Sequence, residues 1–188
     1  MCCIFNLGIK KQTILARKPS HMPRLLVALL LSLGLAQAAR AAAGGAGGGP
    51  YPFHNGGFER GSFAGWTLDA AFTQVMSQDY DGFAPHGGSH YALLGTRGAD
   101  GALSQDFSDV AGQKLRIGFW LASDGALPND FSVSFNGAPL LVLASVPRSG
   151  WVFYHVSATA TGLGQLTFSF RNDSGYLALD QVSVRRAL

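Results

Sequence analysis

The acidic residues are the side chains of this sequence that are best suited to acid–base chemistry, and they are few. Glu59 is the only glutamate among eleven acidic residues, and the others are aspartates. Hydrolysis of a glycosidic bond usually needs two carboxylates about 5–10 Å apart, one of them with a raised pKa. Half of the aspartates stand in turn-like segments: Asp81, Asp100, Asp124, Asp130 and Asp173. An aspartate in a turn commonly bonds to its own backbone, so these residues favour turn formation over catalysis.

Serine and histidine residues do not have a known catalytic spacing either. Ser89 precedes His90, but neighbouring side chains of a strand point to opposite faces, and no serine stands in a GxSxG motif. His86, His90 and His155 do not form a zinc-binding spacing such as HExxH, and isolated histidines are usually surface or edge residues. The sequence therefore predicts a protein that is not an enzyme.

Aromatic and planar polar residues favour ligand binding instead. Sugars are recognised by flat aromatic rings, which pack on pyranose C–H groups, and by a few polar side chains. Trp120 and Arg171 stand on the polar faces of their predicted strands. Phe153 and His155 stand opposite the apolar face of theirs. If these strands are neighbours, the four side chains line one shallow ligand-binding surface; the alternative is that a loop such as Asp79–Gly88 covers the aromatic rings.

Short strands must position these residues. Apolar and polar residues alternate, as in a sheet buried on one face, in three segments: 114–122, 130–137 and 165–173. From Asn55 onward, no stretch of twelve residues has helical periodicity. Other strands are predicted at Trp66–Ser77, His90–Leu94, Ala102–Phe107, Leu140–Ala144, Val152–Ala160 and Leu177–Val184.

Turn signals and a change of phase define the fold class. Asn136–Gly137 lies between two apolar runs and predicts a hairpin, because Asn-Gly readily forms a type I′ turn. The apolar positions change parity between Leu179 and Val182, which predicts a β-bulge near Asp180 and Gln181. About nine short strands with this spacing predict an all-β fold of two antiparallel sheets, a β-sandwich of the jelly-roll type.

Several segments in this order resemble a known group of domains. "NGGFERGSFAGWT", "PHGGSHYALLG", "GQKLRIGFWLA" and "SFRNDSGYLALDQVSV" resemble the galactose-binding-like jelly-roll domains of secreted bacterial proteins, often those with a PEP-CTERM sorting tail. The order is also similar to that of β-sandwich carbohydrate-binding modules. The resemblance covers about Asn55–Val184, nearly all of the chain after the leader; it implies the galactose-binding-like jelly-roll fold and is poorly specific for a ligand.

The same resemblance implies a structural calcium ion. In related modules the glutamate of the first strand and an aspartate of the last meet at calcium, which takes about six to eight oxygen ligands. The matching residues here are Glu59 and Asp180, with backbone carbonyls, for example of the HGGS turn, as further ligands. Gln181 replaces a second aspartate of the family motif. From the residues alone, the alternative is that both carboxylates are solvated or pair with Arg60 or Arg185.

The N-terminal residues predict export. Leu25–Leu35 is an apolar run, shorter than the about 20 residues of a membrane-spanning helix, with Arg24 before it and small residues after it. This order is typical of a secretory signal peptide, with cleavage after Ala38 or Ala41.

The chain is therefore divided into three parts by its sequence. Residues 1–41 are predicted to be the leader, 42–54 a glycine-rich linker, and 55–186 the β-sandwich domain. Residues 1–21 make the leader unusually long, so we expect Met22 to be the true start.

Removal of the leader changes the charge of the chain. Eight basic and eleven acidic residues follow Ala41, a formal charge of −3, whereas the full chain has +3. Nucleic-acid binding, which needs a clustered basic face, therefore loses its support. Both cysteines, Cys2 and Cys3, belong to the leader, so the domain must fold without a disulfide.

These observations predict a secreted protein, extracellular or periplasmic, without a membrane anchor after signal cleavage. Its expected role is to recognise extracellular or cell-surface polysaccharide. The alternative is a structural or interaction protein of the extracellular matrix that has no small-ligand site.

Overall fold

The computed structural model describes residues 52–187; the predicted leader and most of the predicted linker lie outside this range. All regular structure within it is β-strand, and no helix that could cross a membrane occurs there. The strands are β1 (Thr67–Asp69), β2 (Gln74–Met76), β3 (Tyr91–Leu94), β4 (Gly101–Ser108), β5 (Lys114–Ser123), β6 (Asn129–Phe135), β7 (Ala138–Ala144), β8 (Ser149–Thr159), β9 (Leu163–Asn172) and β10 (Leu177–Arg186).

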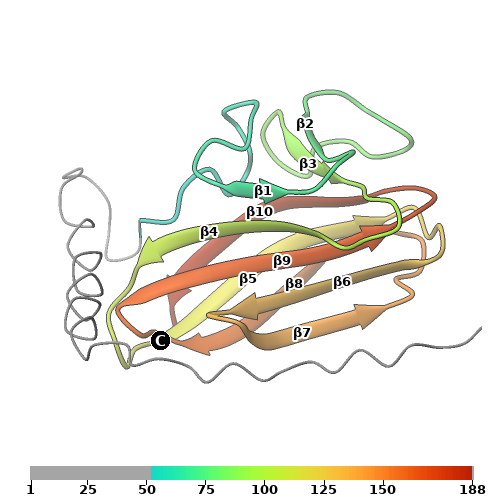
Figure 1. The fold of residues 1–188 in the computed structure, drawn as a ribbon. Coiled ribbons are helices and arrows are strands. Elements are labelled where there is room, and N and C mark those ends of the chain that lie inside the picture. Colours follow the sequence, from blue (N-terminus) through green and yellow to red (C-terminus); the bar gives the residue numbers. More distant parts are fainter. Residues whose placement is uncertain (1–51, 188) are drawn as a thin grey trace, which may run out of the picture. The chain divides into compact units, whose positions relative to one another are not determined.

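The strands form two antiparallel sheets of five strands each. Sheet A has the order β1-β4-β9-β6-β7, and sheet B has the order β2-β3-β10-β5-β8. Figure 1 shows the two layers, with β4, β9, β6 and β7 in front of β10, β5 and β8. Consecutive strands repeatedly change sheet, for example β9 to β10. The predicted jelly-roll β-sandwich is confirmed.

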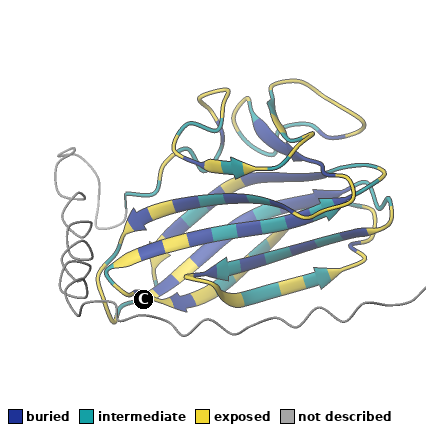
Figure 2. Cartoon of the chain, in the orientation of Figure 1, coloured by how far each residue is buried: buried dark blue, intermediate teal, exposed yellow. Residues whose placement is uncertain are grey.

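The core lies between the sheets and follows the predicted alternation. Leu115, Ile117 and Phe119 of β5 are fully buried, as are Phe168 and Phe170 of β9. Figure 2 shows buried and more exposed positions alternating along β4 and β9. Burial of one such side chain contributes about 1.5–3 kcal/mol, so the core fixes which residues remain on the outer faces.

Two boundaries differ from the prediction. The segment Trp66–Ser77 is not one strand but two, β1 and β2, which belong to different sheets. Phe72, between them, has φ 60°, which an extended strand does not allow. The folded part also begins before Asn55, because the ring of Phe53 packs edge-on against Trp66 at a centroid distance of 5.3 Å.

Both predicted irregularities are confirmed. Asn136 and Gly137 have φ values of 50° and 76°, and they connect β6 to β7 as a hairpin. The register between β10 and β5 shifts between Asp180 and Ser183, with Gln181 at φ 48°. This bulge is the reason that Asp180 and Ser183 both lie on the outer face of sheet B.

The opening motif NGGF packs against this bulge. Gly56 O accepts a hydrogen bond from Val182 N at 2.8 Å, and a Cβ on Gly56 would overlap the carbonyl oxygen of Val182. Asn55 Nδ2 donates to the carbonyl oxygens of Ser62 and Ala64 at 2.9 and 3.1 Å. The motif therefore fixes the segment that precedes β1 to the last strand.

Candidate functional site

A groove with a volume of about 560 Å³ lies on the outer face of sheet B, along β5 and β10. We call it the β5–β10 groove. It is lined by Gly57, Arg116, Gly118, Trp120, Phe153, Gln181, Val182, Ser183 and Arg185. Gly118 leaves room for it, because a Cβ there would lie 3.0 Å from the Phe153 ring and 3.3 Å from Ser183 Oγ.

The structure brings three of the four predicted ligand-binding residues together. Trp120 of β5 is the register partner of Phe153 on β8, and Gly118 is the partner of His155. The ring centroids of Trp120 and Phe153 are 5.3 Å apart, and those of Phe153 and His155 are 6.2 Å apart. Phe153 is 46% exposed, so its ring is open to a ligand.

Arg171 is not part of this group. It belongs to β9 in sheet A, where its Nε and Nη2 atoms donate to the Asp173 carboxylate at 2.9 and 2.7 Å. This hydrogen bonding lowers the pKa of Asp173 to about 2. The prediction that Arg171 lines the same surface is wrong, because alternation gives the face of a strand but not the sheet to which the strand belongs.

The loop Asp79–Gly88 covers part of the aromatic surface, as the alternative interpretation predicts. The His86 ring stacks on Trp120 with a centroid distance of 3.8 Å and an interplanar angle of 21°. Trp151 Nε1 donates to Ala84 O at 3.0 Å and so attaches this loop to β8. One face of Trp120 is therefore occupied by the protein itself, whereas Phe153 remains exposed.

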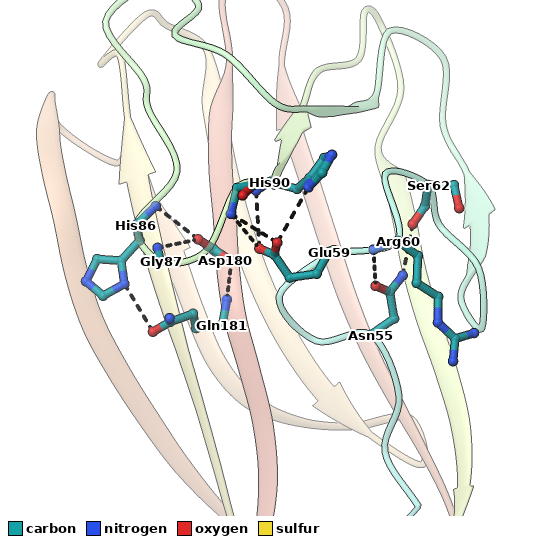
Figure 3. A network of polar contacts seen from close by, with 10 residues as sticks. Asn55, Glu59, Arg60, Ser62, His86, Gly87, His90, Asp180 and Gln181 are labelled. Atoms are coloured by element: carbon teal, nitrogen blue, oxygen red, sulfur yellow. Dashed lines mark hydrogen bonds and ion pairs between the residues drawn. The ribbon is translucent and has the colours of Figure 1, made fainter.

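Asp180 binds this loop from the bulge of β10 (Figure 3). Its Oδ2 atom accepts the backbone N–H groups of His86 and Gly87 at 3.0 and 3.1 Å. Its Oδ1 atom accepts the N–H of Gln181 at 2.6 Å. Asp180 is fully buried, and desolvation raises the pKa of its carboxyl to about 6 although these three bonds oppose the shift.

Glu59, in the segment before β1, binds the backbone directly after this loop (Figure 3). Its carboxylate accepts the backbone N–H groups of Ser89 and His90 at 3.0–3.2 Å, and its Oε2 atom lies 3.5 Å from His90 Nδ1. Desolvation raises its pKa, but the contacts of Ser89 and His90 together lower it below the ordinary value. Gly88 has φ 68°, and a Cβ there would overlap Glu59 Oε1. Glu59 thus pairs with His90 and not with Arg60.

The two carboxylates approach one point beside Gly57. A Cβ on Gly57 would lie 3.8 Å from Asp180 Oδ1 and 3.9 Å from Glu59 Oε1. Such oxygens suit calcium, so the donor chemistry fits the implied ion. Residues 52–187 contain no group of three or more His, Cys, Asp or Glu that could hold a metal, so carbonyls and water would have to complete the shell. The HGGS turn donates backbone N–H groups to both carboxylates.

Sequence reasoning missed four residues that line the groove: Arg116, Gln181, Ser183 and Arg185. The signal for Arg116 was present, because the alternation of β5 places it on the same face as Trp120. The change of parity at the bulge places Arg185 on this face as well, directly opposite Arg116 in the register. The arginines could therefore have been found from the pattern that located the tryptophan.

Comparison with known proteins gives a likeness of fold. No family model and no curated protein sequence matches the chain. Its fold is similar to that of TmCBM61, solved in complex with β-1,4-galactotriose, at 22% identity and a TM-score of 0.55, covering 72% of this chain and 97% of that one. The fold is also similar to that of the CBM22-1–CBM22-2 tandem domain of Paenibacillus barcinonensis Xyn10C, at 18% identity and a TM-score of 0.52. This match covers 77% of this chain and 47% of that one.

A third similar structure is an enzymatically active domain. It belongs to tailspike protein 4 of bacteriophage CBA120, with 18% identity, a TM-score of 0.53, and coverage of 73% of this chain and 22% of that one. Identities this low establish the fold alone. The chain has the β-sandwich fold of carbohydrate-binding modules.

Proposed function

We propose that this protein binds extracellular or cell-surface polysaccharide in the β5–β10 groove and does not act on it chemically. The observation that carries the proposal is the exposed Phe153 ring beside Trp120 at a groove of about 560 Å³. Aromatic faces pack against the C–H groups of sugar rings. Gln181 and Ser183, which also line the groove, supply hydrogen-bond donors and acceptors for hydroxyl groups.

The absence of catalysis is proposed from the residues of the groove. Of the described residues, none that lines it carries a carboxylate, so the pair of acids that most glycosidases need is not found there. Two of the similar structures are carbohydrate-binding modules, which supports binding, while the tailspike domain is described as enzymatically active. A search for released sugars after incubation with each polysaccharide tests this part; any hydrolysis would contradict it.

Export belongs to the same proposal. The signal-peptide pattern of residues 1–41 supports an extracellular or periplasmic location, and the resemblance to PEP-CTERM-associated domains is consistent with it. N-terminal sequencing of the protein recovered outside the cytoplasm should find a start after Ala38 or Ala41.

Affinity electrophoresis of the full chain in gels that contain neutral or acidic polysaccharides tests the binding proposal. We expect at least one polysaccharide to slow the protein, and we expect Phe153→Ala to remove this effect. Phe72→Ala is the matched control, because Phe72 is also exposed but lies between β1 and β2, away from the groove. No retardation by any polysaccharide would contradict the proposal, as would a loss with Phe72→Ala alone.

We propose also that a structural calcium ion binds between Glu59 and Asp180. The support is that oxygens of both carboxylates face one point beside Gly57. A ligand that binds only the folded state stabilises it, so chelator should lower the melting midpoint and added calcium should restore it. Glu59→Gln should remove the response, whereas Asp173→Asn, which changes a carboxylate in another region, should keep it. A midpoint that ignores chelator would contradict the calcium proposal.

A further inference from the structure

One end of the β5–β10 groove carries positive charge without a counter-ion. Arg116 of β5 and Arg185 of β10 are direct register partners, and both are exposed at the groove. Like charges directly opposite each other on neighbouring strands destabilise a sheet. The ion pairs among residues 52–187 involve other side chains, so neither arginine has an acidic partner there. The fold therefore keeps two guanidinium groups together without neutralising them.

Other residues on this face do not supply the missing charge. Lys114, two positions before Arg116, adds a further positive charge, and its Nζ donates to Thr159 Oγ1 at 2.9 Å. Asp180 faces Trp120, four residues along β5 from Arg116, which is about 13 Å at the usual rise of a strand. Asp180 is also buried and bonded to three backbone N–H groups, so it does not neutralise the arginines.

Two adjacent guanidinium groups are suited to one kind of ligand group. Arginine presents planar, parallel N–H donors that bind carboxylate or sulfate-like oxyanions in a bidentate manner. The carboxylate of a uronic acid and the sulfate ester of a sulfated sugar share this chemistry. Trp120 lies four residues from Arg116 along β5, about 13 Å, and the Phe153 ring lies over Gly118, two residues from Arg116, so one chain of sugars can contact both the aromatic rings and the arginines.

We propose that the groove binds an acidic polysaccharide. Arg116 and Arg185 hold the negatively charged group of one sugar residue, while Phe153 packs against another residue of the same chain. This inference rests on the proposed function and narrows its ligand class from polysaccharides in general to those with carboxylate or sulfate groups.

The experiment compares polymers that differ only in charge. The full chain is titrated with polygalacturonate and its fully methyl-esterified form, and with a sulfated galactan and its desulfated form. We expect the charged form of at least one pair to bind at least about tenfold more tightly than the neutral form, which is the effect of one charge-assisted hydrogen bond. Binding of the charged form should weaken as salt rises, because exposed charges are screened.

Variants locate the effect in the groove. Arg116→Gln and Arg185→Gln should each weaken binding of the charged polymer about tenfold, and more than they weaken binding of the neutral form, so the preference for charge should shrink. Arg186→Gln is the matched control, since it removes the same charge one residue further along, at a position that does not line the groove. All three variants replace exposed side chains, and an unchanged melting midpoint verifies that each one folds.

The outcomes distinguish the proposal of polysaccharide binding in general from the narrower proposal of acidic polysaccharide binding. Tighter binding of polygalacturonate than of its methyl ester identifies carboxylate as the group that the arginines hold, and tighter binding of the sulfated galactan than of its desulfated form identifies sulfate. Equal affinity for charged and neutral forms, or arginine variants without effect, overturns this inference and leaves the proposed function standing. Failure to bind any carbohydrate overturns both. Equally tight binding of polyglutamate also overturns the inference, because the groove would then recognise negative charge without sugar.

Discussion

Arginine residues on the outer faces of the two sheets have opposite surroundings. On sheet A, Arg171 forms two hydrogen bonds with Asp173, at 2.9 and 2.7 Å. On sheet B, Arg116 and Arg185 face each other, and neither has an acidic partner among the described residues. The first arginine is neutralised by the protein, whereas the other two pair with no acid within residues 52–187. The same residue type on a polar strand face is thus paired within the protein in one sheet and left without an acidic partner in the described part of the other, which is the basis of the proposed role in binding.

The exposed phenylalanines of the two regions differ in a similar way. Phe72 is 58% exposed, but Arg97 lies over its ring at 5.2 Å, and the pocket that Phe72 lines has a volume of only about 40 Å³. Such a pocket holds a few water molecules at most. A hollow of about 490 Å³ nearby is lined by Ala71 and Arg97 but not by Phe72. Phe153 is 46% exposed beside a groove of about 560 Å³. The two exposed rings therefore differ in the space that each one lines, and this difference supports the proposal that Phe153, and not Phe72, contacts a ligand.

The largest loss of stability is expected from Asp180→Ala. This variant removes the carboxylate that holds the loop Asp79–Gly88 against the outer face of sheet B. The variant loses the acceptor of three backbone N–H groups, so the free energy of unfolding should fall by about 3 kcal/mol in chelator. Denaturant unfolding measures this loss. Asp173→Ala, on the side of Arg171, removes a partly exposed acid and should be much less destabilising. Equal losses would mean that the loop Asp79–Gly88 does not depend on Asp180.

Gly118→Ala should have the next largest effect. The new Cβ would lie 3.0 Å from the Phe153 ring, so the ring must move, at a cost of about 1 kcal/mol in stability and with weaker polysaccharide binding. Gly150→Ala in β8 is the control, because nothing lies within 4 Å of its Cβ. Thermal melting and affinity electrophoresis of both variants provide the comparison. Unchanged polysaccharide binding by Gly118→Ala would contradict a role for Phe153 in the binding site.

Arg185→Glu should give the outer face of sheet B an arginine–carboxylate pair like that of Arg171 and Asp173 on sheet A. A glutamate opposite Arg116 can form a cross-strand ion pair, so stability should rise by about 0.5 kcal/mol. Binding of acidic polysaccharide should be lost at the same time. A variant that is less stable than the original protein would show that the facing arginines are not a strain on the sheet.

The smallest effect is expected from Arg171→Gln, and it disappears in acid. The folded-state pKa of Asp173 is about 2, below its ordinary 3.8, so the pair stabilises the fold above about pH 4 and loses this contribution as pH falls through 2. The melting midpoints of the variant and the original protein should therefore differ above pH 4 and converge near pH 2. Polysaccharide binding at neutral pH should not change. A loss of binding would place Arg171 in the site after all.

Much of the fold could be predicted because alternation is a local property. The phase of Leu115, Ile117 and Phe119 gave the buried face of β5, and the parity change before Val182 gave the bulge. The Asn136–Gly137 hairpin followed from backbone preferences. The division of Trp66–Ser77 into two strands could not be predicted in this way, since it depends on which sheet receives each half.

The site could be predicted only in part, for the same reason. Trp120, Phe153 and His155 could be placed on one face because their strands alternate clearly and are neighbours, although His155 does not line the β5–β10 groove. Arg171 was misplaced because the pairing of strands is set by contacts distant in sequence. The stacking of His86 on Trp120 depends on carboxylates 30 and 94 residues away from the N–H groups that they bind. The calcium ion remains a prediction.

The most direct test of ligand binding in the β5–β10 groove uses the three tryptophans as separate probes. Trp120 lines the groove, whereas the indole N–H groups of Trp66 and Trp151 donate to backbone carbonyls at 3.1 and 3.0 Å. The isotope-labelled full chain is titrated with galactotriose and with trigalacturonate while the indole N–H signals are followed by NMR. We predict that at least one sugar, with trigalacturonate favoured, shifts the Trp120 signal and leaves that of Trp66 in place. A Trp120 signal that neither sugar moves would contradict it.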